Sequence, residues 1–574
     1  MSGGRGPVSV RRGRQAAGGI AAAAGMIAVL TLLARATGFA RWFVFSGAVG
    51  TTCVGNVYNA ANTLPNVLYE VAAGGVLAAV AVPLIARSLS RGEEAVADRI
   101  ASALLTWAVT LLVPLAALLF LLAGPISELL LVRTSQCPGA QQLGADMIRV
   151  FAPQVPLYGI GIVLAGVLQA HRRFLAAAVA PLLSSLVVIC AYLLYGALAH
   201  GRGDDIAALP PEATLGLTAG TTLGVAALSL PLFGPVLRAG VRLRPAWHFP
   251  DGVAGRARGL AGAGLLALVA QQAAVMVTVL LAANHGATGS LTVYQYIQAV
   301  YLLPYAVLAV PVAISTFPAL VAEDVAGTDA AGAGASVASG ATAAPTVAAP
   351  TLAAPTLARS ARAVVLAMGL GAGVLVAVAG PVASVFTVID AGRSASAGST
   401  ALAAMPSGLV AFAPGLVGFG LMALLTRALY VRGRPALAGR WVAAGWLVAA
   451  LGSLVVLVGG TVSSRRLLVS LGVASTLGMT LAAVGLVLTV RSAWGVTALT
   501  GLTRSLAASV VGGASAGLAG AVVAGAVPTS GLAASVGAGV LAAMLTLVVF
   551  VVVVAAGDRD SGRVLLGRVR RSRA

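Results

Sequence analysis

The sequence contains no lysine and few charged residues of any kind. All 36 basic residues in the 574-residue chain are arginine, and charged residues make up only 9% of it. A soluble protein of ordinary composition carries about 25% charged residues. The missing lysine excludes a Walker A phosphate-binding loop and a Schiff-base nucleophile. Any transport by this chain would therefore not be driven by a P-loop of its own.

Cysteine and histidine are also scarce. The three cysteines and four histidines show no metal-ligand spacing, so we expect no metal site, no catalytic residues and no enzyme. Cys53 and Cys137 both fall in loops that we place on the outer side of the membrane, where a disulfide can form. No cofactor is expected. Whether transport would be coupled to an ion or to the membrane potential is left open.

Long apolar runs dominate what remains. The chain is 59% hydrophobic, with a mean hydropathy of +0.99. Apolar runs of at least about 18 residues recur throughout, which predicts an all-α polytopic membrane protein. The fourteen predicted spans are 17–49, 54–86, 99–131, 142–169, 174–199, 213–237, 258–283, 290–322, 361–389, 401–430, 435–459, 465–490, 505–527 and 531–556.

Arginine is distributed unevenly between the predicted loops. Alternate loops and both termini hold 28 arginines, whereas the opposite loops hold five. The positive-inside rule therefore places both termini in the cytoplasm. Because the arginines lie in short loops between apolar spans, they do not indicate a nucleic-acid partner.

The predicted domains follow the loops. A basic arm at 1–16 precedes an N-lobe of six spans at 17–237, a cytoplasmic linker at 238–257 and a C-lobe of six spans at 258–490. The C-lobe includes a loop at 325–358 that we expect to be disordered, because proline recurs every fifth residue near its end. Two further spans at 505–556 and a basic tail at 557–574 follow.

The second span carries an unusual polar stripe. Asn56, Asn59, Asn62, Asn66 and Glu70 fall within an arc of about 120° on a helix. Polar groups inside a bilayer usually face the bundle interior or a water-filled cavity, so the stripe predicts a path for something hydrophilic. The alternative is that these asparagines hold helices together.

Further polar and flexible positions accompany the stripe. Pro65 is expected to interrupt the second span, and Gly74 and Gly75 to serve as a packing or bending point. In the second half of the chain we predict that polar side chains face the cavity or hydrogen-bond across helices: Gln271, Gln272 and Gln298, with Tyr294, Gln295 and Tyr296 as further candidates.

Several motifs resemble those of one transporter family. The segment Leu33-Ala-Arg-Ala-Thr-Gly-Phe-Ala-Arg41 is similar to the first-span signature of the MurJ/MviN lipid II flippases. The second-span Leu64-Pro65-Asn66 and the turn from Gly166 to Phe174 resemble two more of their motifs. The chain departs from the family pattern at Asn56, at Tyr69-Glu70 and at Gln298-Ala299.

The resemblance implies a fold and a function. The fold would be MATE-like, within the flippase superfamily that includes MATE transporters, with two pseudo-symmetric six-helix lobes and two C-terminal helices. The function would be export of undecaprenyl-diphosphate-linked peptidoglycan precursor (lipid II) across the bacterial plasma membrane by alternating access. The expected partners are this lipid-linked oligosaccharide, membrane lipids and cell-wall synthesis proteins. Alternatives are a flippase for another polyprenyl-linked glycan, a non-transporting cell-wall scaffold and a MATE-type exporter.

Two arginines in the first span suit such a cargo. Arg35 and Arg41 flank Gly38, and arginine binds phosphate oxygens through two parallel hydrogen bonds. We therefore predict that Arg35 and Arg41 bind the diphosphate, with Gly38 as a packing or bending point. Alternatively, Arg41 reaches the outer interface, or both arginines pair with Glu70. A combined hypothesis is that Glu70 pairs with an arginine until the diphosphate displaces it.

Overall fold

The computed structural model describes residues 8–71, 78–132, 136–250, 253–335, 353–391, 398–458 and 462–557. Every regular element within these ranges is a helix, which confirms the predicted all-α class. Gly74 and Gly75 lie outside the described residues.

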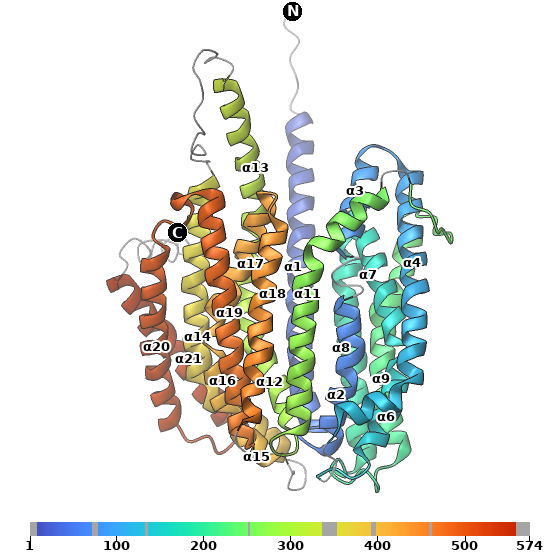
Figure 1. Cartoon of the computed structure of the whole chain (residues 1–574), viewed down its shortest axis with the longest axis vertical. Helices are drawn as coiled ribbons and strands as arrows, with labels where there is room; N and C mark the ends of the chain where they lie inside the picture. The colour runs from blue at the N-terminus through green and yellow to red at the C-terminus, as the bar shows by residue number, and fades with distance from the viewer. Residues whose placement is uncertain are drawn as a thin grey trace, which may run out of the picture.

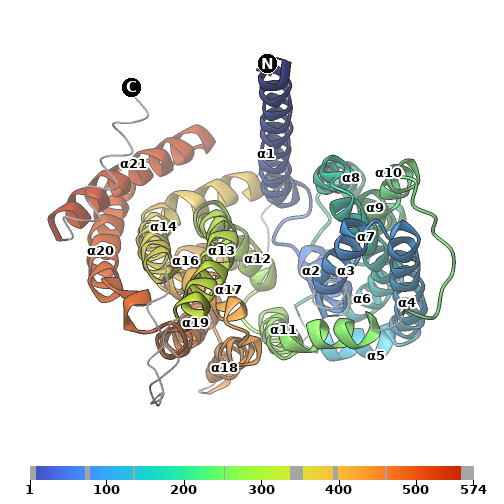
Figure 2. The same cartoon turned by 90° about the horizontal axis from the view of Figure 1, so that it is seen from above.

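The first half of the chain forms one bundle, the N-lobe, beside a long first helix (Figure 1). This first helix, α1, spans Val8–Ala48, packs along α8 and stands between the two bundles (Figure 2). The other helices of the N-lobe are α2 Cys53–Tyr69, α3 Ala78–Ser90, α4 Glu94–Leu121, α5 Ala123–Leu130, α6 Ala140–Phe151, α7 Gln154–Ala170, α8 Phe174–Ala199, α9 Pro211–Ser229 and α10 Phe233–Arg238.

The second half forms the C-lobe, and two more helices lie outside it (Figure 2). The C-lobe contains α11 Val253–Asn284, α12 Ser290–Pro304, α13 Val310–Ala335, α14 Ala353–Ala391, α15 Ser399–Ala403, α16 Met405–Phe412, α17 Gly415–Val431, α18 Pro435–Ser453 and α19 Ser464–Trp494. The outer pair is α20 Leu502–Ala526 and α21 Leu532–Gly557, both packed on α14. One-turn helices lie at Leu230–Leu232, Tyr305–Ala309, Leu454–Leu457 and Val496–Leu499.

The helices agree with the predicted spans. Within the described residues, 11 helices are long and apolar enough to cross a membrane, or 12 if α16 and α17, bent by 43°, form one span. The two remaining predicted spans, 17–49 and 54–86, correspond to α1 and to α2 with α3. The chain is thus a multi-pass membrane protein.

Small residues determine how closely α20 approaches the C-lobe. Gly369 and Gly373 on α14 face Ser509 and Gly513 on α20, and a Cβ at Gly373 would lie 2.9 Å from the carbonyl oxygen of Gly513. Small residues spaced four apart allow membrane helices to approach through their backbones. This contact holds the outer helix pair against α14.

Two local expectations are wrong. Pro65 lies inside α2 and does not interrupt it; the helix continues to Tyr69 and ends in a π turn at Glu70. Membrane helices tolerate proline because neighbouring groups satisfy the freed carbonyl. The loop expected at 325–358 is also shorter, since α13 extends to Ala335 and α14 begins at Ala353.

The predicted loop was too long because of the composition of the end of α13 and the position of a proline in α14. Alanine is the strongest helix former, and it is frequent at the end of α13. Pro355 falls in the first turn of α14, where its missing N–H has no helical partner to lose.

Candidate functional site

The polar stripe on α2 divides into two parts. Asn56 accepts a hydrogen bond from the backbone N–H of Leu291 at 3.3 Å and donates to the carbonyl of Ala283 at 3.4 Å. Asn59 donates to Thr292 Oγ1 at 3.0 Å. These bonds join α2 to the end of α11 and the start of α12, so the first two asparagines hold the lobes together.

The next two asparagines line a polar cavity of about 160 Å³. Asn66 accepts a hydrogen bond from the hydroxyl of Tyr158 at 3.0 Å. The Oδ1 atom of Asn62 is buried and has no hydrogen-bond partner within the described residues. The wall consists of Arg41, Trp42, Tyr58, Asn59, Asn62, Thr63, Asn66, Tyr158, Ser184, Val188, Tyr192, Thr221, Val225 and Gln295.

Hydroxyl groups extend the polar surface of this cavity into the N-lobe. The hydroxyl of Tyr58 lies 3.0 Å from that of Tyr192 and 3.0 Å from Thr221 Oγ1. These side chains come from α2, α8 and α9. Three helices therefore provide hydrogen-bonding groups that a hydrated head group could use.

Arg41 is the charged residue in this wall. It is half-buried near the end of α1, and no carboxylate in the described part of the chain lies within 4.0 Å of its guanidinium. Tyr58, Tyr158 and Tyr192 all lie within electrostatic range of it. The cavity thus presents an uncompensated positive charge among neutral polar groups.

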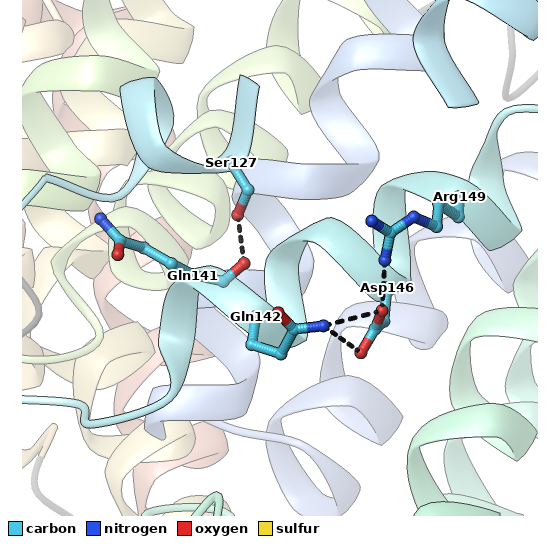
Figure 3. Close-up of polar contacts among 5 residues, drawn as sticks. All are labelled: Ser127, Gln141, Gln142, Asp146 and Arg149. Atoms are coloured by element: carbon cyan, nitrogen blue, oxygen red, sulfur yellow. Dashed lines mark hydrogen bonds and ion pairs between the residues drawn. The ribbon is translucent and has the colours of Figure 1, made fainter. Parts of the chain in front are cut away.

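Arg149 shows the opposite arrangement. Its Nη1 lies 2.6 Å from Asp146 Oδ1 on the same helix, α6, and Gln142 also donates to Asp146 (Figure 3). Figure 3 also shows Ser127 Oγ donating to the carbonyl of Gln141, which ties α5 to α6. Among the described residues, an ion pair is found between Arg149 and Asp146, and neither of them lines the cavity.

Some predicted site residues lie away from the cavity. Arg35 is exposed on α1, and Glu70 is half-buried in the π turn after α2; neither lines the cavity or pairs with the other. The alternative in which Glu70 pairs with Arg35, Arg41 or both is therefore not seen among the described residues in this conformation. At Gly38, an added Cβ would make only an ordinary contact, 3.9 Å from Ser185 Oγ, so close packing does not explain this glycine.

A second cavity, of about 300 Å³, lies in the C-lobe. Two of the predicted glutamines, Gln271 and Gln298, line it, together with Tyr294 from α12; Gln272 is buried elsewhere. None of its lining residues is charged. Gln295 on α12 lines both cavities and forms part of the boundary between them.

The lobes meet at the end where α1 turns into α2. The backbone N–H and Oγ1 of Thr51 donate to Asp390 of α14, at 3.3 and 2.8 Å. Gly289, at φ +82°, lies so close that a Cβ would come within 2.5 Å of the Thr51 carbonyl oxygen. We call the contact between Thr51 and Asp390 the interlobe latch.

A disulfide strengthens the N-lobe side of this end. Cys53, at the start of α2, is bonded to Cys137, with the two Cα atoms 5.7 Å apart. The backbone N–H of Cys53 also donates to Asp204 at 3.0 Å. The loops before α2, before α6 and after α8 are therefore fastened together beside the latch.

The residues that were not predicted are mostly tyrosines. Tyr58, Tyr158 and Tyr192 line the first cavity and Tyr301 the second. The chain has only ten tyrosines, and a buried tyrosine hydroxyl normally requires a partner. Because these tyrosines lie inside apolar spans, their hydroxyl groups could have been predicted to face a polar cavity or another helix.

The chain is similar to known proteins over most of its length. A family model described as "Lipid II flippase MurJ" matches residues 45–537. A probable lipid II flippase MurJ from Rhizobium tropici is 28% identical over 298 residues, 50% of this chain and 53% of that protein. One from Synechocystis sp. is 27% identical over 229 residues, 39% of this chain and 42% of that protein. The chain therefore spans about half the length of these relatives.

Solved structures show the same fold. A lipid II flippase MurJ in an inward closed conformation has a TM-score of 0.66 at 13% identity, covering 93% of this chain and 99% of that one. An inward-facing multidrug resistance MATE family transporter of the MOP superfamily has a TM-score of 0.57 at 14% identity, with 83% and 95% covered. At these identities the likeness concerns the fold alone.

Proposed function

This chain belongs to the MurJ lipid II flippase family, a family of membrane transporters rather than enzymes, and we propose that it exports lipid II across the bacterial plasma membrane. Lipid II is an undecaprenyl diphosphate that carries a disaccharide-peptide head. The proposed mechanism is alternating access, in which the cavity is exposed to each side of the membrane in turn.

The observation that carries the proposal is Arg41 in the polar cavity. On insertion scales an arginine at the centre of a membrane helix costs about 2.5–3.5 kcal/mol. Arg41 lies nearer the end of α1, where the cost is smaller, but it is half-buried in the wall of a cavity, and this position calls for a function. Its guanidinium is always charged and matches phosphate oxygens in a bidentate manner. With no carboxylate within ion-pair distance in the described residues, Arg41 can accept the diphosphate without first losing another partner.

The neutral polar groups support the same cargo. The asparagine and tyrosine side chains around Arg41 can replace the water that a hydrated head group gives up. A MATE-type exporter of organic cations would instead need carboxylates, and the cavity wall contains none. The charge of the site therefore favours an anionic lipid.

The direction of transport follows from the proposed topology. We place both termini and the arginine-rich loops in the cytoplasm, where lipid II is made. The end that carries the latch and the disulfide would then face outward and would be closed in this conformation. Opening the latch would release the head group outside.

Substitution of Arg41 tests the proposal. We expect Arg41→Ala to reduce export of lipid II by about 10- to 100-fold, because hydrogen bonds to a charged group contribute about 1.5–3 kcal/mol. Arg41→Lys keeps the charge but loses the bidentate geometry, so it should retain partial activity. The measurement is the fraction of lipid II in the outer leaflet of cells that depend on the variant.

Arg149→Ala is the matched control, because it removes an arginine whose charge Asp146 already balances. It should leave export unchanged. Full export by Arg41→Ala, at normal protein levels, would contradict the proposed role of the cavity. Unchanged outer-leaflet lipid II after depletion of the wild-type protein would contradict the function itself.

A further inference from the structure

The C-lobe cavity contains polar groups that the diphosphate does not explain. The hydroxyl of Tyr301 and the Nε1 atom of Trp446 are both buried and have no hydrogen-bond partner within the described residues. Tyr301 is only 4% exposed, and both residues line the cavity. An unmade hydrogen bond at a buried polar group costs about 1–3 kcal/mol, so two in one cavity indicate a ligand that pairs with them.

The lining determines the chemical class of that ligand. Because the wall carries no charge, it does not provide counter-ions for phosphate, carboxylate or ammonium groups. A lipid tail would leave the glutamine amides and the hydroxyl groups unpaired. A ligand that suits this wall is neutral, has several hydroxyl or amide groups and presents one apolar face.

Aromatic rings and amides stand together in this wall. Tyr301 packs against Phe412, with ring centroids 5.6 Å apart, and Phe419 and Trp446 provide further ring surface. Gln298, Thr278 and Tyr294 add an amide and two hydroxyl groups to the same wall. Flat rings beside amides suit a sugar ring, which is apolar on its C–H face and carries hydroxyl groups at its edge.

The position of the cavity relates it to Arg41. Gln295 lines both cavities, so the two cavities adjoin at this side chain. The volume of about 300 Å³ is at the lower end of the range for small-molecule sites, as a single sugar ring requires.

We propose that the C-lobe cavity binds a neutral sugar ring of the lipid-linked head group while Arg41 holds the diphosphate. This inference rests on the proposed function and divides its substrate between the lobes. Tyr301, Trp446, Gln271 and Gln298 provide the contacts to the sugar, and Gln295 lies between the two subsites.

Conservative variants test the sugar subsite. Tyr301→Phe removes the unpaired hydroxyl and keeps the ring. Trp446→Phe removes the unpaired N–H and replaces the indole by a smaller aromatic ring, and Gln298→Ala removes an amide. Tyr305→Phe and Trp441→Phe are matched controls, because they make the same substitutions at residues that do not line the cavity: Tyr305 packs against Phe419, and Trp441 lies on α18 with Trp446. Thermal unfolding of each purified variant checks that it is folded.

The probes are undecaprenyl diphosphate, lipid II and lipid II from which the peptide has been removed. Binding to the full chain in nanodiscs is measured for each. We expect the three variants to weaken binding of both sugar-bearing lipids by about 3- to 10-fold and to leave undecaprenyl diphosphate unchanged. The control variants should match the wild type with every lipid.

The outcomes separate this inference from the proposed function. If wild type binds lipid II and Arg41→Ala weakens it, but the three variants do not, the sugar subsite is wrong and the function stands. If the variants matter only when the peptide is present, the cavity binds peptide and the inference is overturned. If wild type binds none of the three lipids, both the function and the subsite fail.

Discussion

At the scale of single residues, identical side chains on α2 do different work. Asn59 and Asn62 both line the cavity, but the amide of Asn59 donates to Thr292 of α12, whereas the buried Oδ1 of Asn62, one turn further along, has no partner in the described chain. The difference lies in what faces each residue. Substitutions of Asn59 and Asn62 should therefore differ in their effects: one should mainly lower stability, and the other should mainly lower transport.

We expect Asn59→Ala to reduce stability by about 0.6–2 kcal/mol, the range for hydrogen bonds between membrane helices, since Thr292 is left buried without its donor. Asn62→Ala should change stability by less than about 0.5 kcal/mol but reduce export of lipid II. The measurements are thermal unfolding in detergent and outer-leaflet lipid II. Equal effects of both substitutions on both measurements would show that the division is wrong.

The sequence could predict the face of α2 but not this division. Helical periodicity places all four asparagines on one side of the span. In the structure Asn56 and Asn59 are buried, and Asn62 and Asn66 line the cavity. Whether an inward side chain meets another helix or a cavity depends on residues far away, such as Leu291 and Tyr158. A single sequence carries no signal for such pairings.

At the scale of elements, the corner between α1 and α2 is held by parts of the C-lobe. Asp390 accepts two hydrogen bonds from Thr51, and Gly289 lets the α11–α12 connection approach the same backbone. Under the proposed alternating access, these contacts would separate at some point in the cycle. We therefore propose that the latch determines how readily this end opens.

Asp390→Asn tests the latch. The amide keeps the size of the side chain but loses the charge, and the weaker hydrogen bonds should favour opening by about 1–2 kcal/mol. We expect faster hydrogen exchange at residues 49–56 and 285–292 and unchanged exchange in α20 and α21. Ser384→Ala, on the same helix but bonded to Thr529, is the control. Identical exchange in both variants would exclude a latch.

The elements themselves were largely predictable, and their exceptions have physical causes. Apolar runs located the spans because a bilayer tolerates little else. Pro65 was misjudged because its effect depends on neighbours that satisfy the carbonyl group it frees. The second cavity was only half predicted: Gln271 and Gln298 stand out in apolar helices, whereas Tyr301 and Trp446 resemble ordinary packing residues until their unpaired atoms are seen.

At the scale of the whole molecule, the loops that we predict to lie outside meet at one end. Thr51 contacts Asp390, Cys53 contacts Cys137 and Asp204, and Ala287 donates to Ser464. In Figure 1 the α1–α2 and α11–α12 connections lie together at the lower end. When a chain crosses a membrane repeatedly, every second loop lies on the same side, so loops gathered in this way agree with the predicted series of spans. Which end faces the cytoplasm is a prediction from arginine alone.

Thiol labelling in intact cells tests this orientation. Asp205 and Ser90 are both exposed and lie in loops that we assign to opposite sides. In a Cys190→Ser background, Asp205→Cys should react with a membrane-impermeant maleimide added outside, whereas Ser90→Cys should react only after permeabilisation. The disulfide keeps Cys53 and Cys137 unreactive. Labelling of Ser90→Cys in intact cells would reverse the topology, and the closed end would then face the cytoplasm, which contradicts the proposed direction of export.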